Sequence, residues 1–147
     1  MADIRSFSKA KAIQLALLGG ETLLGRELQG VLEGRGTGIS ITGYASTGEG
    51  NFSEHEGESV YLKPLDAGSI RGDLAILTAG SLEGALKAYG LAKAAGGHPC
   101  VIDCSGHLEN QPEARITAPL LEYPDPKASW LLVIAHPAAS AVALVLT

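Results

Sequence analysis

Short apolar runs that alternate with helix-like segments restrict the fold of this chain more than any other feature. Two of the clearest runs are Ile13 to Leu18, which ends at Gly19-Gly20, and Asp73 to Thr78. Runs of this length that are apolar almost throughout, rather than at every second residue, are typical of strands buried on both faces. Helical segments between such strands indicate a mostly parallel sheet with helices on both faces. The sequence therefore predicts an α/β fold.

The other elements follow from the same patterns. Apolar residues at helical spacing predict a helix that begins at Glu21 or Thr22 and ends at Gly34. Further strands are expected at 39–44, 59–62, 99–103 and 131–135. Further helices are expected from Ser81 to Ala95 and from Ala138 onward, and the polar, glycine-rich stretch 45–57 is expected to be a loop.

The length and composition indicate one globular domain over residues 1–147. Apolar residues make up 46% of the chain, and a net charge of -5 without a basic stripe argues against a nucleic-acid partner. The first residues contain no apolar run of the signal-peptide type. Cys100 and Cys104 on an extended strand would lie roughly 13 Å apart, too far for a disulfide. A reducing, cytoplasmic setting is therefore expected.

Residues 128–147 contain no Asp, Glu, Lys or Arg. A stretch of about 20 such residues is long enough to cross a bilayer. However, His136-Pro137 interrupts this one at its middle, and its first half has the pattern of a strand. We therefore expect a buried strand followed by a buried helix, and no membrane span.

The residues that follow each strand form the candidate site, because ligands of a doubly wound sheet bind at the carboxyl ends of its strands. They are Gly19-Gly20-Glu21-Thr22, Tyr44-Ala45-Ser46, Thr78-Ala79-Gly80-Ser81, Asp103-Cys104-Ser105 and His136-Pro137-Ala138.

In order and spacing these segments resemble the semialdehyde dehydrogenase family, which includes aspartate-semialdehyde dehydrogenase and N-acetyl-γ-glutamyl-phosphate reductase. Gly19 to Gly25 resembles the family's phosphate turn, Gly-Ala-Thr-Gly-x-x-Gly, and Ala45-Ser46 resembles its Ala-Ser. Thr78 to Ser81 resembles Ser-Ala-Gly-Gly-Ser, and Val101 to Ser105 resembles Val-Ile-Asp-Asn-Ser. His136 to Ser140 resembles Asn-Pro-Asn-Cys-Ser/Thr, the turn that carries the nucleophilic cysteine.

The resemblance implies a Rossmann-type, N-terminal NAD(P)-binding domain with the strand order 3-2-1-4-5-6. It implies NAD or NADP as cofactor and no metal. The cofactor-binding positions that it implies are Gly19, Gly20, Thr22, Gly25, Ser46, Thr47, Ala79 and Gly80.

Several departures from the family pattern predict a degenerate site. Ala139 stands at the position of the nucleophilic cysteine, and a methyl group forms no covalent intermediate. Thr22 replaces the glycine that lets the backbone approach the pyrophosphate, and Glu21 brings an anion beside the expected phosphate. The second strand is followed neither by an acidic residue for the ribose of NAD nor by an arginine for the 2′-phosphate of NADP. We therefore expect weak cofactor binding at most. The alternative is that residues 19–25 are only a tight strand-to-helix turn.

Cys104 is the one thiol at a strand carboxyl end and the only candidate replacement for the nucleophile. Activation would require a positive partner such as His107 or His136. An ordinary small apolar residue is the simpler interpretation, and the spacing of these three residues matches no established zinc pattern. Asp103 is expected to cap the turn after its strand.

Three hypotheses follow for function. The first is a degenerate family member, inactive as an oxidoreductase on its own because it lacks both the nucleophile and the family's second domain. The second is an NAD(P)-binding module of an aldehyde or oxo-group oxidoreductase that works with a missing domain or partner. The third is an interaction domain that forms homo-oligomers through the apolar segment from Ala141 to Leu146.

Overall fold

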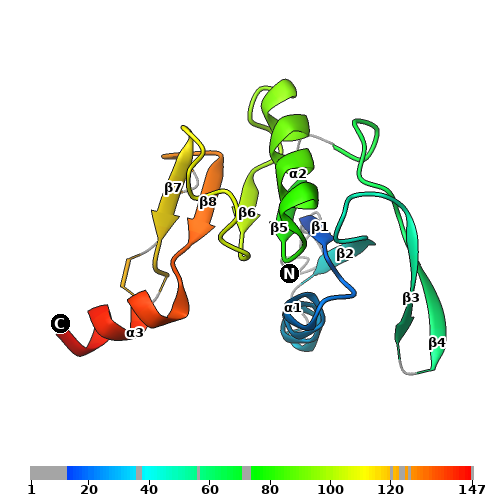
Figure 1. Ribbon diagram of the computed structural model, residues 1–147, viewed down its shortest axis with the longest axis horizontal. Helices are drawn as coiled ribbons and strands as arrows, with labels where there is room; N and C mark the ends of the chain where they lie inside the picture. The colour runs from blue at the N-terminus through cyan, green and yellow to red at the C-terminus, as the bar shows by residue number, and fades with distance from the viewer. Residues whose placement is uncertain are drawn as a thin grey trace, which may run out of the picture.

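A six-stranded parallel sheet in the order β2-β1-β5-β6-β8-β7 forms the centre of the protein (Figure 1). The structure is a computed structural model that describes residues 13–35, 38–55, 57–70, 74–119, 121–122, 125 and 127–146. The strands of the sheet are β1 Ile13–Leu18, β2 Ile39–Tyr44, β5 Leu74–Thr78, β6 Val101–Asp103, β7 Ala114–Thr117 and β8 Leu131–Ile134. The helices are α1 Leu23–Gly34, α2 Leu82–Ala94 and α3 Pro137–Leu146. This architecture confirms the predicted Rossmann-type α/β fold.

The predicted strand order is correct for five strands and wrong at both edges of the sheet. The expected third strand at 59–62 is instead β4, Glu58–Leu62, which pairs antiparallel with β3, Asn51–His55, in a separate two-stranded sheet. The predicted loop at 45–57 is correct for residues 45–50 and wrong where β3 lies, at Asn51–His55. An isolated bridge between Tyr44 and Lys63 joins the end of this hairpin to β2. In Figure 1 the hairpin extends away from the sheet beside α1.

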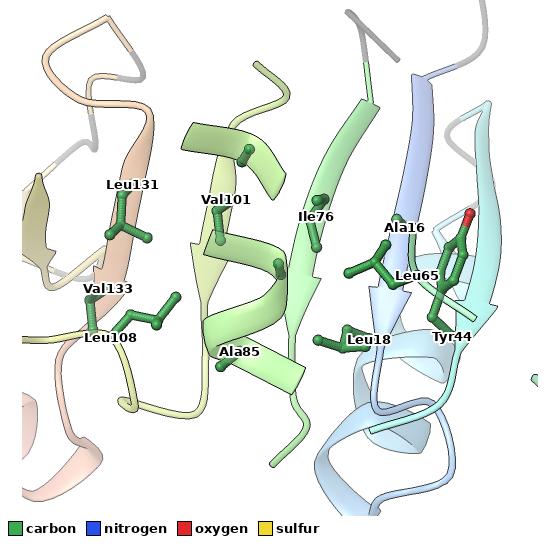
Figure 2. Packing of buried hydrophobic residues seen from close by; sticks show 12 residues of the cluster. Ala16, Leu18, Tyr44, Leu65, Ile76, Ala85, Val101, Leu108, Leu131 and Val133 are labelled. Carbon is green, nitrogen blue, oxygen red and sulfur yellow. The ribbon is translucent and has the colours of Figure 1, made fainter. Parts of the chain in front are cut away.

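Two apolar layers hold the helices on the sheet. On one face, α2 contributes the fully buried Ala85, Ala88 and Ala92, whose small side chains let the helix lie close to Ile76 and Val101 (Figure 2). On the other face, Leu28 and Leu32 of α1 pack against Leu15, Leu17 and Leu77. Burial of apolar surface on both faces explains why the central strands are apolar throughout.

Hydroxyl side chains fix the starts of the two helices that cover the sheet. Thr22 caps α1 by accepting a hydrogen bond from the Gly25 amide, and Ser81 caps α2 by accepting one from the Gly84 amide. Each side chain satisfies one of the amides that a helix leaves without a partner in its first turn.

An aromatic cluster joins the end of α2 to the amino-terminal edge of the sheet. Trp130 stacks on Tyr89 with ring centroids 5.6 Å apart. The Tyr89 hydroxyl donates to Glu113, and Glu113 forms an ion pair with Lys93 at 2.8 Å. The ring of Trp130 also lies where a Cβ on Gly97 would come within 2.6 Å, so only glycine fits there.

Helix α3 lies at the end of the chain beyond β8 and has no buried residue (Figure 1). The prediction of a buried C-terminal helix is therefore wrong, because no other described element covers it. Within the described residues, no helix reaches the length and hydropathy required to cross a membrane.

Candidate functional site

The turns after β1, β2 and β5 lie in close contact at the carboxyl edge of the sheet. A Cβ on Gly19, which has φ +88°, would lie 2.7 Å from the backbone of Ala79 and Gly80. A Cβ on Gly80 would lie 2.7 Å from the Ser46 carbonyl oxygen. The glycines predicted as cofactor-binding residues therefore also allow the turns to approach one another.

The backbone of Ser46 is the point at which the three turns are joined. Its amide donates to Glu21 Oε1 at 2.7 Å. Its carbonyl oxygen accepts hydrogen bonds from the Ser81 amide at 3.2 Å and from the Ser81 hydroxyl at 3.0 Å. Thr47, the neighbouring predicted residue, is exposed, and its hydroxyl accepts from the Glu49 amide at 3.3 Å.

Thr22 fills the space that the family pattern leaves open with glycine. Its hydroxyl accepts from the Gly25 amide at 3.0 Å and donates to the Gly19 carbonyl oxygen at 2.7 Å. The same hydroxyl lies 3.0 Å from the carbonyl oxygen of Ala79. Gly25 is equally confined, since a Cβ there would lie 2.0 Å from the Gly19 oxygen. The Thr22 side chain of the predicted phosphate turn thus contacts the turn after β5.

Glu21 lies at the edge of a small pocket between α1 and the hairpin. The pocket has a volume of about 220 Å³, and its lining includes Gly20, Arg26, Gln29 and Ser53. Glu21 Oε1 holds the Ser46 amide, whereas Glu21 Oε2 is buried and has no hydrogen-bond partner among the described residues. This carboxylate therefore stands at the carboxyl end of β2 although it belongs to the turn after β1.

A larger pocket of about 620 Å³ lies between α1, the carboxyl ends of β6 and β8, and the start of α3. It brings together Cys104, His136 and Ala139, which the sequence placed at separate strand ends. The lining residues are Leu24, Leu28, Cys104, Ser105, Gly106, Glu109, Ile116, Val133, Ile134, Ala135, His136, Pro137 and Ala139. Sequence reasoning missed Glu109 and Ile116, because they lie in a loop and in an unpredicted edge strand.

Cys104 is not an activated thiol. Burial, and after it the charge of the neighbouring Asp103 carboxylate, raises its pKa to about 11. Among the residues that the structure describes, no cation lowers this pKa, so the thiol form predominates at neutral pH. His107 is exposed and does not line the pocket.

Asp103 is fully buried and organises the loop that follows β6. Its Oδ1 accepts from the Thr78 hydroxyl at 2.6 Å and from the amide and hydroxyl of Ser105, and its Oδ2 accepts from the Leu108 amide at 2.8 Å. These bonds confirm the predicted turn-forming role. The bond to Thr78 additionally joins β5 to β6.

His136 is exposed at the mouth of the larger pocket, where its Nδ1 accepts from the Ala138 amide at 3.1 Å. Across the part of the chain that the structure describes, no group of three or more His, Cys, Asp or Glu side chains has the arrangement of a metal site.

The sheet order and the turns at its carboxyl edge define a Rossmann-type α/β domain, and comparison with solved structures gives a narrower fold match. Aspartate semialdehyde dehydrogenase II from Vibrio cholerae, complexed with ASA, aligns with 91% of this chain and 45% of its own, at 19% identity and a TM-score of 0.62. A second structure of that enzyme aligns with 90% of this chain and 41% of its own, at the same identity and TM-score. A probable aspartate-semialdehyde dehydrogenase from Pseudomonas aeruginosa aligns with 91% of this chain and 41% of its own, at 23% identity and a TM-score of 0.64.

The protein therefore has the fold of a domain of the aspartate-semialdehyde dehydrogenases, and it spans less than half the length of these chains. No protein-family model and no curated protein sequence matches the chain.

Proposed function

We propose that this chain is a degenerate domain of the semialdehyde dehydrogenase type that has no oxidoreductase activity on its own. The observation that supports the proposal is that Ala139 lines the 620 Å³ pocket. In the sequence resemblance, Ala139 takes the position of the family's nucleophilic cysteine. A methyl group accepts neither an aldehyde nor an acyl group covalently, so the two-step route through an enzyme-bound intermediate is lost.

Cys104 does not replace that nucleophile. With a pKa of about 11, its thiolate form is on the order of one molecule in ten thousand at pH 7. Of the described side chains that line this pocket, only His136 is able to carry a positive charge, and it lies at the exposed mouth.

We further propose that NAD or NADP binds only weakly, through the turn that contains Gly19, Gly20, Thr22 and Gly25 and its neighbours Ser46, Thr47, Ala79 and Gly80. The Thr22 hydroxyl accepts a hydrogen bond from the Gly25 amide. That amide lies at the helix N-terminus, where it would otherwise be available to a phosphate. The Glu21 carboxylate adds a negative charge beside the same turn. Both features weaken the attraction for a diphosphate.

The test is to restore the missing thiol. Ala139→Cys and the matched control Ala139→Ser are assayed with the unmodified chain for NAD(P)-dependent, phosphate-requiring oxidation of aspartate semialdehyde. The unmodified chain and Ala139→Ser are expected to give no turnover. Turnover by the unmodified chain that is proportional to its concentration and survives alkylation of Cys104 would refute the proposal.

A second candidate function is homo-oligomerisation through α3, and it rests on the exposure of that helix. Val145 is 84% exposed and Leu146 is 80% exposed, next to the exposed Val142. A self-complementary two-fold contact is the commonest way in which such a surface is buried.

A further inference from the structure

We propose that the 620 Å³ pocket is a binding site for an uncharged small molecule with an apolar body and one carbonyl or hydroxyl oxygen. This inference concerns the side chains that line the pocket and does not depend on cofactor binding at the turn after β1.

The size and walls of the pocket fit such a ligand. A volume of about 620 Å³ lies within the range of small-molecule sites, which is about 300–1,000 Å³. Leu24 and Leu28 of α1 form one wall, Ile116 of β7 and Ile134 of β8 contribute apolar surface, and Ala139 lies at the start of α3. Leu24 is 41% exposed and Ile116 is 56% exposed, so apolar surface is available to a ligand without a rearrangement of the core.

The charges around the pocket select against anions. None of the described lining residues is a lysine or an arginine, whereas Glu109 contributes a carboxylate. Cys104, with a pKa of about 11, remains an uncharged thiol at neutral pH. An amino-acid semialdehyde or an acyl phosphate carries anionic groups for which this lining offers no lysine or arginine, and an incompletely paired charge in an apolar pocket is unfavourable.

His136 provides the polar contact that would orient a neutral ligand. Its Nδ1 accepts from the Ala138 amide at 3.1 Å, so in the neutral ring the proton is on Nε2. Nε2–H is then available to donate to a carbonyl or hydroxyl oxygen. The Ser105 hydroxyl, which donates to Asp103 Oδ1, leaves acceptor capacity for a ligand hydroxyl.

The experiment compares 2-octanone with octanoate, which share an apolar chain and differ in charge. Each is titrated into the protein, and binding is followed by backbone-amide NMR. We expect 2-octanone to produce saturable shifts at Ser105, Glu109 and Ala139, and octanoate to bind at least about tenfold more weakly because of its unpaired charge.

Substitutions at two similarly exposed residues distinguish binding in the pocket from binding to other apolar surface. Ile116→Glu adds a second carboxylate to the lining and is expected to weaken 2-octanone binding by about tenfold. Val31→Glu is the control, because Val31 is 54% exposed, similar to Ile116 at 56%, and lies outside the lining. It should bind 2-octanone as the unmodified chain does.

Three results would overturn the proposal. They are equal or tighter binding of octanoate, equal loss of binding in both variants, and ketone affinity that falls as protein concentration rises, which would mean that a second copy occupies the pocket. Oxidoreductase turnover or tight NAD(P) binding would contradict the proposed function instead and would leave the comparison of the two ligands intact.

Discussion

Glu21 and Thr22 use their side chains within the protein at the point where a Rossmann turn otherwise meets its ligand. Glu21 reaches the Ser46 amide, and the Thr22 hydroxyl reaches the carbonyl oxygens of Gly19 and Ala79. These contacts stabilise the three turns relative to one another and reduce the number of groups available to a diphosphate. For the cofactor binding proposed above, the structural role of these two residues would oppose the binding of a diphosphate.

The substitution Glu21→Gln should separate the two roles. The glutamine side chain keeps a carbonyl oxygen for the Ser46 amide but removes the negative charge. Since the interaction between two solvent-screened charges contributes up to about 1 kcal/mol, NADH and NADPH affinity should rise by up to about fivefold. Calorimetry measures the change, and Glu33→Gln is the control because Glu33 lines the same small pocket at the far end of α1. Equal effects of the two substitutions would show that only the net charge matters.

Cys104 should react slowly with iodoacetamide at neutral pH and faster as the pH rises toward 11. Its raised pKa has two causes, burial first and Asp103 second, so the folded protein favours the thiol and opposes the thiolate. The corresponding stability is present below the unfolded thiol pKa of 9.0 and is lost as the pH rises toward about 11. Mass spectrometry of a Cys100→Ala variant follows the single remaining thiol. A rate that levels off below pH 9 would contradict this prediction.

For single residues, the sequence predicts which positions are structurally important better than it predicts their hydrogen-bond partners. The role of Asp103 was predictable because a carboxylate after a strand commonly accepts amides from the next turn. Its bond to Thr78 and the bond from Ser46 to Glu21 were not, since each spans 25 residues of sequence. Such pairs depend on which strands become neighbours, and that information is absent from local spacing.

Two glycines in α2 differ in their surroundings and should respond oppositely to alanine. A Cβ on Gly84 would lie 1.9 Å from the Ser46 carbonyl oxygen, so the turn after β2 would have to move. A Cβ on Gly90 meets no atom within 4 Å. Gly90→Ala should stabilise the protein by about 0.4–1 kcal/mol, and Gly84→Ala should destabilise it by about 1–3 kcal/mol. Urea unfolding of both variants provides the comparison, and destabilisation by Gly90→Ala would contradict the account.

Elements that bury apolar residues were predictable, and of the exposed elements α3 was predicted as a helix whereas β3 and β7 were missed. The predicted helix from Ser81 to Ala95 corresponds to α2, Leu82–Ala94, with Ser81 as its cap. The strands β3 and β7 lacked a comparable signal, and for β4 the pattern predicted the strand but not its partner. Phe52 is 69% exposed, and β7 is a four-residue edge strand that carries the exposed Arg115 and Ile116. Tertiary context rather than hydrophobic pattern fixes such strands.

For the whole molecule, the exposed apolar side chains of α3 predict self-association. Burial of a few hundred Å² at about 25 cal/mol per Å² contributes several kcal/mol, before the entropy of association is subtracted. Light scattering at micromolar concentration should therefore show a dimer or a larger assembly. Val145→Asp combined with Leu146→Asp should shift it to monomer. Leu23→Asp is the control, because Leu23 is exposed but belongs to α1. A monomeric unmodified chain would remove the support for the interaction-domain hypothesis.

The position of Trp130 has a practical consequence for all of these measurements. It is the only tryptophan in the chain, and it stacks on Tyr89 immediately before β8, whereas His136 and Ala139 follow that strand. The indole emission therefore originates at the opposite edge of the sheet from both candidate sites. An optical signal from this ring should report the loss of tertiary structure while responding little to occupancy at the carboxyl edge. Folding and binding are thus open to independent observation in one unlabelled sample.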